Sequence, residues 1–318
     1  MGLASLASGC GGARSAKPLN LKGIIVFQRQ GKAPAGACFS TCPEDTYVVR
    51  PGNQEVKLGA SLTFAQQLRY FGSWSRDRRR AVMLGCSGRC IQTFDLAVRG
   101  RRVIRRCGGQ NRCYAAPAIS PDGSIIAFLD TRGDPSISVV QFDGAGVRSI
   151  VYHYPPGGVG SASVACPVFS PNGAWIAYQD NLGVIKHPGQ SEEDGSSIRV
   201  VHPDGKGDRA VTHWRAGFTD GCPVWAPDEQ ILAYSESAPP GTDKDFHIYE
   251  IAVAEGAKAK LLTDVPGDRP TYSPNGRAIA FVRFYPDHRD IEVAVGSKLY
   301  RVTNPGERGV DGDPAWVR

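Results

Sequence analysis

One motif returns along most of the chain: a proline, one further residue, an aromatic residue or isoleucine, then Ser-Pro-Asp/Asn-Gly and an apolar run. It reads ACPVFSPNGAWIAYQD at 165–180, and a copy at 71–85 has lost the prolines. The anchor positions of the five copies are Ser75, Ser120, Ser170, Ala226 and Ser273. Their spacings of 45, 50, 56 and 47 residues indicate stacked four-stranded units, such as the blades of a β-propeller.

The residues between the motif copies predict further strands. Each copy is followed by a second pair of apolar segments around a short polar turn, for example ISVVQFDGAGVRSIVY from Ile137. Asp-Gly and Pro-Asn-Gly supply the backbone angles of tight turns between antiparallel strands. The composition agrees, because 38 Gly and 23 Pro accompany only 2 Met, and helix-period apolar patterns are scarce. No apolar run reaches the ~18 residues of a membrane span. The predicted fold class is all-β.

The two ends of the chain complete one another. Residues 313–318 read as the first strand of a repeat, whereas the segment from Lys22 starts at a second strand. We therefore expect a six-bladed β-propeller whose ring is closed by pairing of the C-terminal strand with the N-terminal strands, which leaves no free sheet edge. The expected propeller covers 21–318, after a signal remnant and linker at 1–20. Its blades are expected at about 313–318 with 21–60, 69–106, 116–152, 166–213, 222–264 and 269–303.

The repeats, SPDGSIIAF from Ser120 and SPNGRAIAF from Ser273 among them, resemble the propeller repeats of the TolB family over roughly 21–318. The resemblance implies a TolB-like six-bladed β-propeller. It names no ligand, because the same blade serves binding proteins, lyases and the gating propellers of prolyl-peptidase-type enzymes. Function must therefore be argued from individual residues.

Nine cysteines are many for a reducing compartment. Three sets lie close in sequence, and two further cysteines stand in the same register of adjacent repeats, directly before Pro167 and Pro223. The eight disulfide candidates are Cys38, Cys42, Cys86, Cys90, Cys107, Cys113, Cys166 and Cys222. Exchange between the 38/42 and 86/90 sets stays open. Free thiols and metal ligands are the alternatives, although no histidines stand at finger-like spacing. Oxidised cysteines predict a location outside the cytoplasm, and the resemblance to the TolB family implies the bacterial cell envelope or periplasm.

The ninth cysteine, Cys10, ends the run Leu6-Ala7-Ser8-Gly9-Cys10, which resembles a bacterial lipobox. The match is partial, because Ala7 stands where Leu is usual and only nine residues precede Cys10. A charged region followed by an apolar region of ~7–15 residues does not fit in that space. Either the natural start lies upstream of Met1 or the run is accidental. The even number of remaining cysteines favours the first, so Cys10 is a candidate for lipidation.

Most long connections of the expected propeller fall on one face, which we call the loop face, and the eight disulfide candidates map there too. The opposite face, made mostly of short turns, is the short-turn face. Elaborated loops on a rigid scaffold are typical of binding surfaces. The binding candidates on the loop face are Tyr114, His153, Tyr154, His213, Trp214, Arg215, Phe218, Asp220, Arg269, Arg308 and Asp313. Trp214 is the strongest single candidate; its alternative is a Trp tucked under a neighbouring loop. Arg269 and Asp313 are expected to form an ion pair that closes the channel rim.

Positive charge gathers in the second blade. Residues 69–112 contain twelve Arg against Asp77 and Asp95. Arg78, Arg79 and Arg80 fall on the short-turn face, so a chain lipidated at Cys10 is expected to turn them toward anionic headgroups. Nucleic acid is disfavoured, because these arginines lack interleaved aromatic residues.

The sequence contains no Gly-x-Ser-x-Gly elbow, no phosphate loop and no His-Glu-x-x-His. His153 and His213 stand on equivalent connections and, with Asp220 or Asp311, offer a general acid/base pair or ligands for a divalent metal. Two hypotheses remain. The favoured one is a monomeric extracytoplasmic binding or scaffold protein, without cofactor or metal, that recognises an envelope protein, peptide or glycan. The alternative is a channel-mouth enzyme, a polysaccharide lyase or lactonase-like hydrolase.

Overall fold

The computed structural model describes residues 21–30, 44–59, 72–86, 89–108, 113–132, 134–152, 162–184, 193–228, 230–237, 246–303 and 310–317. Within these ranges every regular element is a β-strand, which confirms the all-β prediction. The same ranges hold no helix long and apolar enough to cross a membrane. The predictions on Cys10, Cys38, Cys42, His153, Tyr154 and Arg308 lie outside the described residues, as does the side chain of Asp313.

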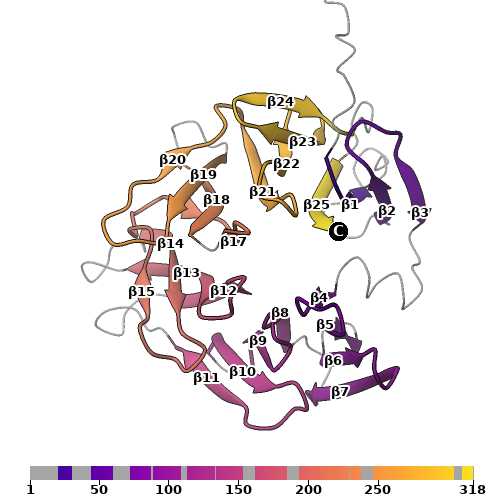
Figure 1. The fold of residues 1–318 in the computed structure, drawn as a ribbon. Helices are drawn as coiled ribbons and strands as arrows, with labels where there is room; N and C mark the ends of the chain where they lie inside the picture. Colours follow the sequence, from indigo (N-terminus) through magenta and orange to yellow (C-terminus); the bar gives the residue numbers. More distant parts are fainter. Residues whose placement is uncertain are drawn as a thin grey trace, which may run out of the picture.

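We number the strands as blades, with the innermost strand first (Figure 1). Blade 1 contains β25 (Val310–Val317), β1 (Ile24–Gln30), β2 (Glu44–Val49) and β3 (Val56–Gly59). Blade 2 contains β4 (Ser73–Trp74), β5 (Arg80–Gly85), β6 (Cys90–Asp95) and β7 (Gly100–Arg106). Blade 3 contains β8 (Tyr114–Ile119), β9 (Ile125–Asp130), β10 (Ser136–Gln141) and β11 (Arg148–Val151).

The remaining strands continue the series around the axis. Blade 4 contains β12 (Ala162–Phe169), β13 (Ile176–Val184), β14 (Glu193–Val201) and β15 (Arg209–Ala210). Blade 5 contains β16 (Thr219–Asp220) and β17 (Val224–Trp225), which both pair with β18 (Ile231–Ser237), then β19 (His247–Ala252) and β20 (Lys260–Leu261). Blade 6 contains β21 (Gly267–Tyr272), β22 (Ile279–Phe284), β23 (Arg289–Val295) and β24 (Lys298–Arg301). Blades 6 and 1 belong to one eight-stranded sheet, because β23 and β25 pair in parallel through Arg289 and Val310.

The repeated motif builds the turns of the short-turn face. Ser170 Oγ donates to Asn172 Oδ1 at 2.8 Å and accepts from the backbone N–H of Trp175 at 2.9 Å. Gly173 occupies the left-handed region, with φ of 78°. Equivalent turns follow Ser120 and Ser273. The Ser-x-Asp/Asn-Gly sequence is therefore local turn chemistry, in which a buried hydroxyl replaces backbone partners.

Apolar side chains fill the space between neighbouring blades. Phe169 and Tyr178 of blade 4 belong to the cluster that packs on Val139 of blade 3. Between blades 6 and 1, Val293 and Trp316 belong to another such cluster. A four-stranded sheet buries its two faces only against other sheets, so each blade depends on its neighbours.

The two ends of the chain meet in blade 1, as the sequence predicts. Strand β25 pairs antiparallel with β1, from Ile24 opposite Val317 to Gln30 opposite Val310. The indole N–H of Trp316 donates to the backbone oxygen of Lys22 at 3.2 Å. The last strand therefore completes a sheet that the first strands begin.

Gly23 tests this junction. It has φ of 98°, and a Cβ atom there would lie 2.6 Å from the backbone oxygen of Val317. Gly59 is a matched control, because its φ is 99° and a Cβ would meet nothing within 4 Å. We expect Gly59→Ala to lower the free energy of unfolding by about 1 kcal/mol through backbone strain alone. Gly23→Ala should cost at least about twice as much, because the clash is added. Urea unfolding measures both, and equal losses would contradict the close approach of β25.

Candidate functional site

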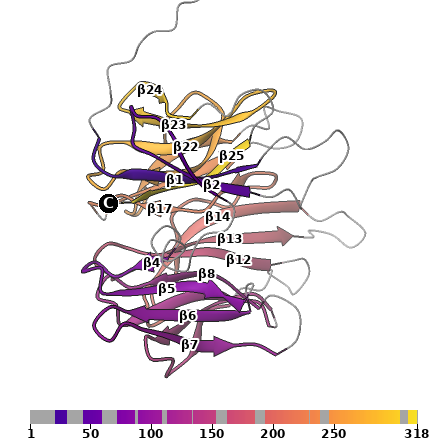
Figure 2. The ribbon, with the colours of Figure 1, turned by 90° about the vertical axis from the view of Figure 1, so that its right-hand side faces the viewer.

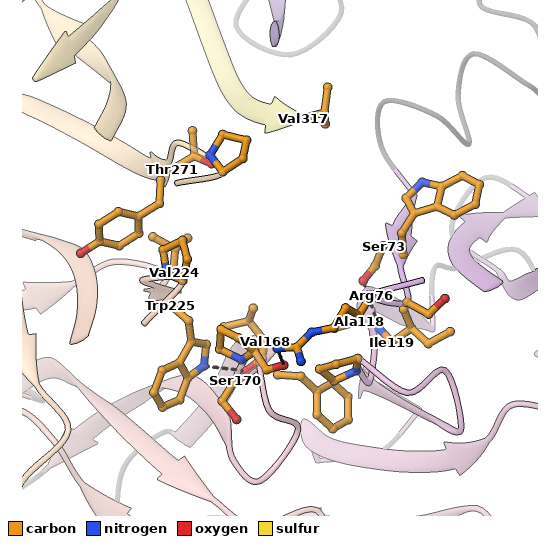
Figure 3. A pocket seen from close by; sticks show the side chains of 18 of the residues that line it. Ser73, Arg76, Ala118, Ile119, Val168, Ser170, Val224, Trp225, Thr271 and Val317 are labelled. Atoms are coloured by element: carbon orange, nitrogen blue, oxygen red, sulfur yellow. Dashed lines mark hydrogen bonds between the residues drawn. The ribbon is translucent and has the colours of Figure 1, made fainter. Parts of the chain in front are cut away.

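Two cavities open at opposite ends of the propeller axis. The cavity at the loop face has a volume of about 570 Å³ and is lined by Gln179, Thr219, Cys222, Phe246, Asp268 and Arg269, among others. The cavity at the short-turn face has a volume of about 500 Å³, and the innermost strands of all six blades contribute to it. Figure 3 shows the latter, with Ser73, Val168, Trp225, Thr271 and Val317 around it. The sequence pointed to the first cavity and gave no sign of the second.

Three of the predicted disulfides are present in the described residues: Cys86–Cys90, Cys107–Cys113 and Cys166–Cys222. The first two close short loops. The third joins the inner strand of blade 4 to the entry of blade 5, and its two Cα atoms are 5.5 Å apart. Because Cys222 also lines the loop-face cavity, this crosslink fixes part of the cavity wall.

The rim of the loop face carries backbone strain at equivalent positions. Ala116, Cys166 and Arg269 have φ of 45°, 53° and 55°, in the left-handed region that non-glycine residues rarely adopt. Each precedes the proline of its inner strand, and strand pairing shifts register at each of these points. The proline removes a backbone donor, so the bulge there follows from the motif. Strained backbone of this kind clusters at functional sites.

The loop-face cavity combines a cation with apolar and amide groups. The side chain of Arg269 is 55% exposed, and its backbone N–H donates to Asp268 Oδ1 at 2.6 Å. The same Asp268 oxygen accepts from Ser235 Oγ at 2.5 Å. Half-buried Phe246 and Gln179 line the same space. A cavity of this composition suits an extended chain with a polar backbone and an apolar or anionic group.

Beside this cavity lies a pair of carboxyl groups, one buried and one half-buried. Asp220 is 1% exposed and stands opposite Glu236 in the β16–β18 pairing. Burial, with the like charge of Glu236, raises the pKa of Asp220 to about 7. Thr212 donates to Asp220, and Arg215 forms an ion pair with Glu236. A proton is therefore held at this pair near neutral pH.

Blade 1 has the same acid with a different partner. Asp311 stands opposite Arg29 in the β25–β1 pairing, and Arg29 Nε lies 2.5 Å from Asp311 Oδ1. Both acids belong to an Asp-Gly-x-Pro-x-Trp segment, at 220–225 and 311–316. Alignment of these two segments together with the strands that pair with them would have found this difference. The residue opposite the shared acid is Arg29 in blade 1 and Glu236 in blade 5.

The binding candidates of blade 5 form a packed loop. The indole N–H of Trp214 donates to the backbone oxygen of Leu182 at 3.0 Å, so this half-buried Trp is tucked against blade 4. The guanidinium of Arg215 lies 3.9 Å from the ring centre of Phe218. The structure thus matches the alternative considered for Trp214. Trp214, Arg215 and Phe218 shape the loop face, and Asp220 lies beneath them.

The other candidates are scattered. Tyr114 is 2% exposed and packs edge-on against Phe128, so it is a core residue and not part of a recognition surface. His213 is exposed. The expected ion pair between Arg269 and Asp313 involves a side chain outside the described residues. In the part of the chain that the structure describes, no group of three or more His, Cys, Asp and Glu is arranged to hold a metal ion.

No family model matches the chain. An uncharacterized peptidase of Bacillus subtilis, YuxL, is 31% identical over 121 residues. That stretch is 37% of this chain and only 17% of the peptidase, so the similarity covers a small part of the relative.

Solved structures show the fold more completely. TolB from Acinetobacter baumannii is 17% identical and superimposes with a TM-score of 0.56 over 92% of this chain and 67% of TolB. A putative TolB from Agrobacterium tumefaciens is 20% identical, with a TM-score of 0.51 over 72% of this chain and 78% of that one. An oligogalacturonate lyase in complex with manganese is 14% identical, with a TM-score of 0.53 over 82% of this chain and 70% of the lyase. The chain therefore has a TolB-like β-propeller fold, and at these identities the likeness concerns the fold alone.

The inter-blade disulfide should dominate the contribution of disulfides to stability. Cys166–Cys222 spans 56 residues, whereas Cys86–Cys90 spans 4. Loss of loop-closure entropy in the unfolded chain scales with this separation, which gives about 4 kcal/mol for the long loop and about 2 kcal/mol for the short one. We expect the Cys166→Ser/Cys222→Ser variant to unfold at lower denaturant than the Cys86→Ser/Cys90→Ser variant, both without reductant. The reverse order would show that the long crosslink is not formed in solution.

The carboxyl pair predicts a pH dependence of stability. The unfolded chain releases the Asp220 proton near pH 4, whereas the folded chain holds it to about pH 7. Between these values the folded state binds more protons, so the free energy of unfolding falls as pH rises, by up to about 1.4 kcal/mol per pH unit. We expect Asp220→Asn to remove this slope in urea unfolding measured from pH 4 to 8. Asp204→Asn, at an exposed acid of blade 4, should retain it.

Proposed function

We propose that this chain is an extracytoplasmic binding or scaffold protein that recognises an extended segment of a partner protein or peptide at its loop face. The observation that carries the proposal is the loop-face cavity at the end of the propeller axis, bounded by a disulfide between two blades. Such a wall is formed before the ligand arrives, which lowers the entropy lost on binding.

The groups around the cavity suit this ligand class. Arg269 offers an exposed cation, Phe246 an apolar ring and Gln179 a hydrogen-bonding amide. Arginine and aromatic residues are the side chains most often found at the centre of protein interfaces. A glycan that stacks on Phe246 is the second ligand class in this proposal.

The proposed location is the bacterial cell envelope or periplasm. The supporting observation is that the described part of the chain contains three disulfides. A lipid anchor at Cys10 stays a prediction. The channel-mouth enzyme that uses His153 and His213 also stays a prediction, since His153 lies outside the described residues.

Peptide selection tests the proposal. Random peptides displayed on phage are selected on the oxidised protein, and the enriched peptides are then measured by fluorescence anisotropy. We expect Arg269→Glu and Phe246→Ala each to weaken binding by about tenfold or more, as for central interface residues. A glycan array carried out in parallel tests the second ligand class. A glycan bound at the same cavity should also bind more weakly to the Arg269→Glu and Phe246→Ala variants.

The control is Arg277→Glu. Arg277 is an exposed arginine of the same blade 6, in the turn after Ser273 on the opposite face. Its substitution changes the net charge equally and should leave binding unchanged. The proposal is wrong if neither peptides nor glycans are enriched, or if the enriched ligands respond to Arg277→Glu as strongly as to Arg269→Glu.

A further inference from the structure

The short-turn face of blade 2 ends in an apolar tip. The turn between β6 and β7 carries Leu96 and Val98, whose exposed fractions are 48% and 76%. The backbone N–H of Leu96 donates to the backbone oxygen of Arg79 at 2.8 Å, so this turn lies directly beside the turn between β4 and β5. Two exposed aliphatic residues therefore stand at the outer end of a blade, next to the most arginine-rich turn of the chain.

Exposed arginines stand next to these aliphatic residues in both turns and at the start of the outer strand. Arg78 and Arg79 belong to the first turn, Arg99 follows Val98, and Arg101 and Arg102 begin the outer strand β7. All five are exposed. These two turns and the start of β7 thus present exposed aliphatic and cationic side chains together, and we call them the blade 2 tip.

The acids of this blade do not remove its charge. Asp77 accepts from Ser75 Oγ and from the backbone of Arg79. Asp95 accepts from the backbone of Ala97 and faces Arg80 Nε at 3.3 Å. Both acids are therefore part of the turns that shape the tip, and the arginines outnumber them.

The structure separates the arginines that hold the fold from those of the tip. Arg80 lies over the ring of Phe142 at 4.6 Å and donates to the backbone oxygen of Gly123, so it joins blade 2 to blade 3. Arg76 donates to the backbone oxygen of Pro171 at 2.8 Å and extends across the short-turn cavity (Figure 3). The sequence-based set Arg78, Arg79 and Arg80 is therefore revised: Arg80 is replaced by Arg99.

We propose that the blade 2 tip docks on an anionic lipid surface, with Leu96 and Val98 entering the boundary between headgroups and acyl chains. The arginines of the tip are complementary in charge to such a surface, and each arginine near it strengthens binding by about fivefold. Exposed aliphatic residues next to exposed arginines are typical of peripheral membrane binding, because the aliphatic side chains enter the boundary with the acyl chains while the arginines contact the headgroups.

Two other uses of the same residues fit less well. Charged side chains on an outer strand such as β7 prevent pairing with other chains, but that role gives no reason to expose Leu96 and Val98. A nucleic acid would contact the arginines through its phosphates and would leave both aliphatic residues in water. The lipid surface is the partner that uses both parts of the tip.

Docking in this way orients the molecule. The turns at 75–80 and 95–100 lie on the same side as the end of β25 (Figure 2). The loop-face cavity is lined by residues at the opposite ends of the inner strands, such as Cys222 and Arg269. The cavity at the loop face then points away from the lipid, toward partners in the surrounding compartment. This orientation needs no lipid anchor at Cys10, and it holds whether or not the loop face binds a peptide.

Vesicle sedimentation tests the proposal. The purified protein is mixed with vesicles of phosphatidylcholine alone or of phosphatidylcholine with phosphatidylglycerol, at low ionic strength. We expect binding to the anionic vesicles only. The Arg78→Ser/Arg79→Ser/Arg99→Ser variant should bind about 100-fold more weakly. The Leu96→Ser/Val98→Ser variant should bind about tenfold more weakly, because less apolar area enters the membrane.

Matched controls come from blade 6. Arg277 follows Ser273 at the same distance as Arg79 follows Ser75, and Leu299 is an exposed aliphatic residue after the corresponding outer turn. Arg277→Ser and Leu299→Ser should each leave vesicle binding within about twofold. Circular dichroism melting checks that every variant is folded, which is expected because all the substituted residues are exposed.

Two results would overturn the proposal. One is that the unmodified protein binds neutral and anionic vesicles equally well, or binds neither. The other is loss of vesicle binding by the arginine variant without any loss by the Leu96→Ser/Val98→Ser variant. A double-stranded oligonucleotide that binds the unmodified protein, and loses affinity only with the arginine variant, would then assign the tip to phosphate polyanions in general.

Discussion

Packing of one blade on the next is the interaction on which this structure depends. A four-stranded antiparallel sheet has two apolar faces and covers neither of them alone. The clusters that bury Tyr178, Phe128 and Trp316 all join residues of two blades. Blade 1 obeys the same requirement with strands from both ends of the chain, since β25 pairs with β1. A change at this pairing therefore acts on the sheet that the chain ends share, as well as on the last strand.

The inner strands shape the cavities as well as the core. Each x-Pro step of β8, β12 and β21 introduces a bulge and a residue with positive φ. The bulges place Cys166 and Arg269 at the loop-face rim. There the disulfide of Cys166 fixes the cavity wall, and Arg269 lines the cavity with a positive charge. The prolines of the inner strands lack a backbone donor and therefore cause the bulges. The same bulges position the residues of the candidate site.

Equivalent positions in the blades carry different chemistry. Opposite a buried Asp, blade 1 has Arg29 and blade 5 has Glu236, so one blade contains an ion pair and in the other the pKa of the buried Asp is raised to about 7. In the first turn of blade 2, Arg78 with φ of 59° stands where blades 3, 4 and 6 have glycine. The repeated motif gives the blades the same backbone structure. Side chains that differ at a few equivalent positions give individual blades different charge and hydrogen bonding.

The repeat in the sequence determined the all-β class, the order of the strands within each repeat and the short turns, because these depend on contacts between residues close in the chain. The Ser-x-Asp/Asn-Gly turn at Ser170 is complete within six residues. Equal register before Pro167 and Pro223 also indicated the Cys166–Cys222 disulfide. Burial and cross-strand neighbours were decided only by the tertiary structure. Tyr114 and Trp214 were predicted at a surface, but one lies in the core and the other is tucked against blade 4. The pairing of Asp220 with Glu236, the short-turn cavity and the separation of Arg80 from the blade 2 tip likewise depend on which blades meet. The hydrogen bonds of a turn depend on neighbouring residues, whereas the surroundings of a side chain depend on segments far apart in the chain.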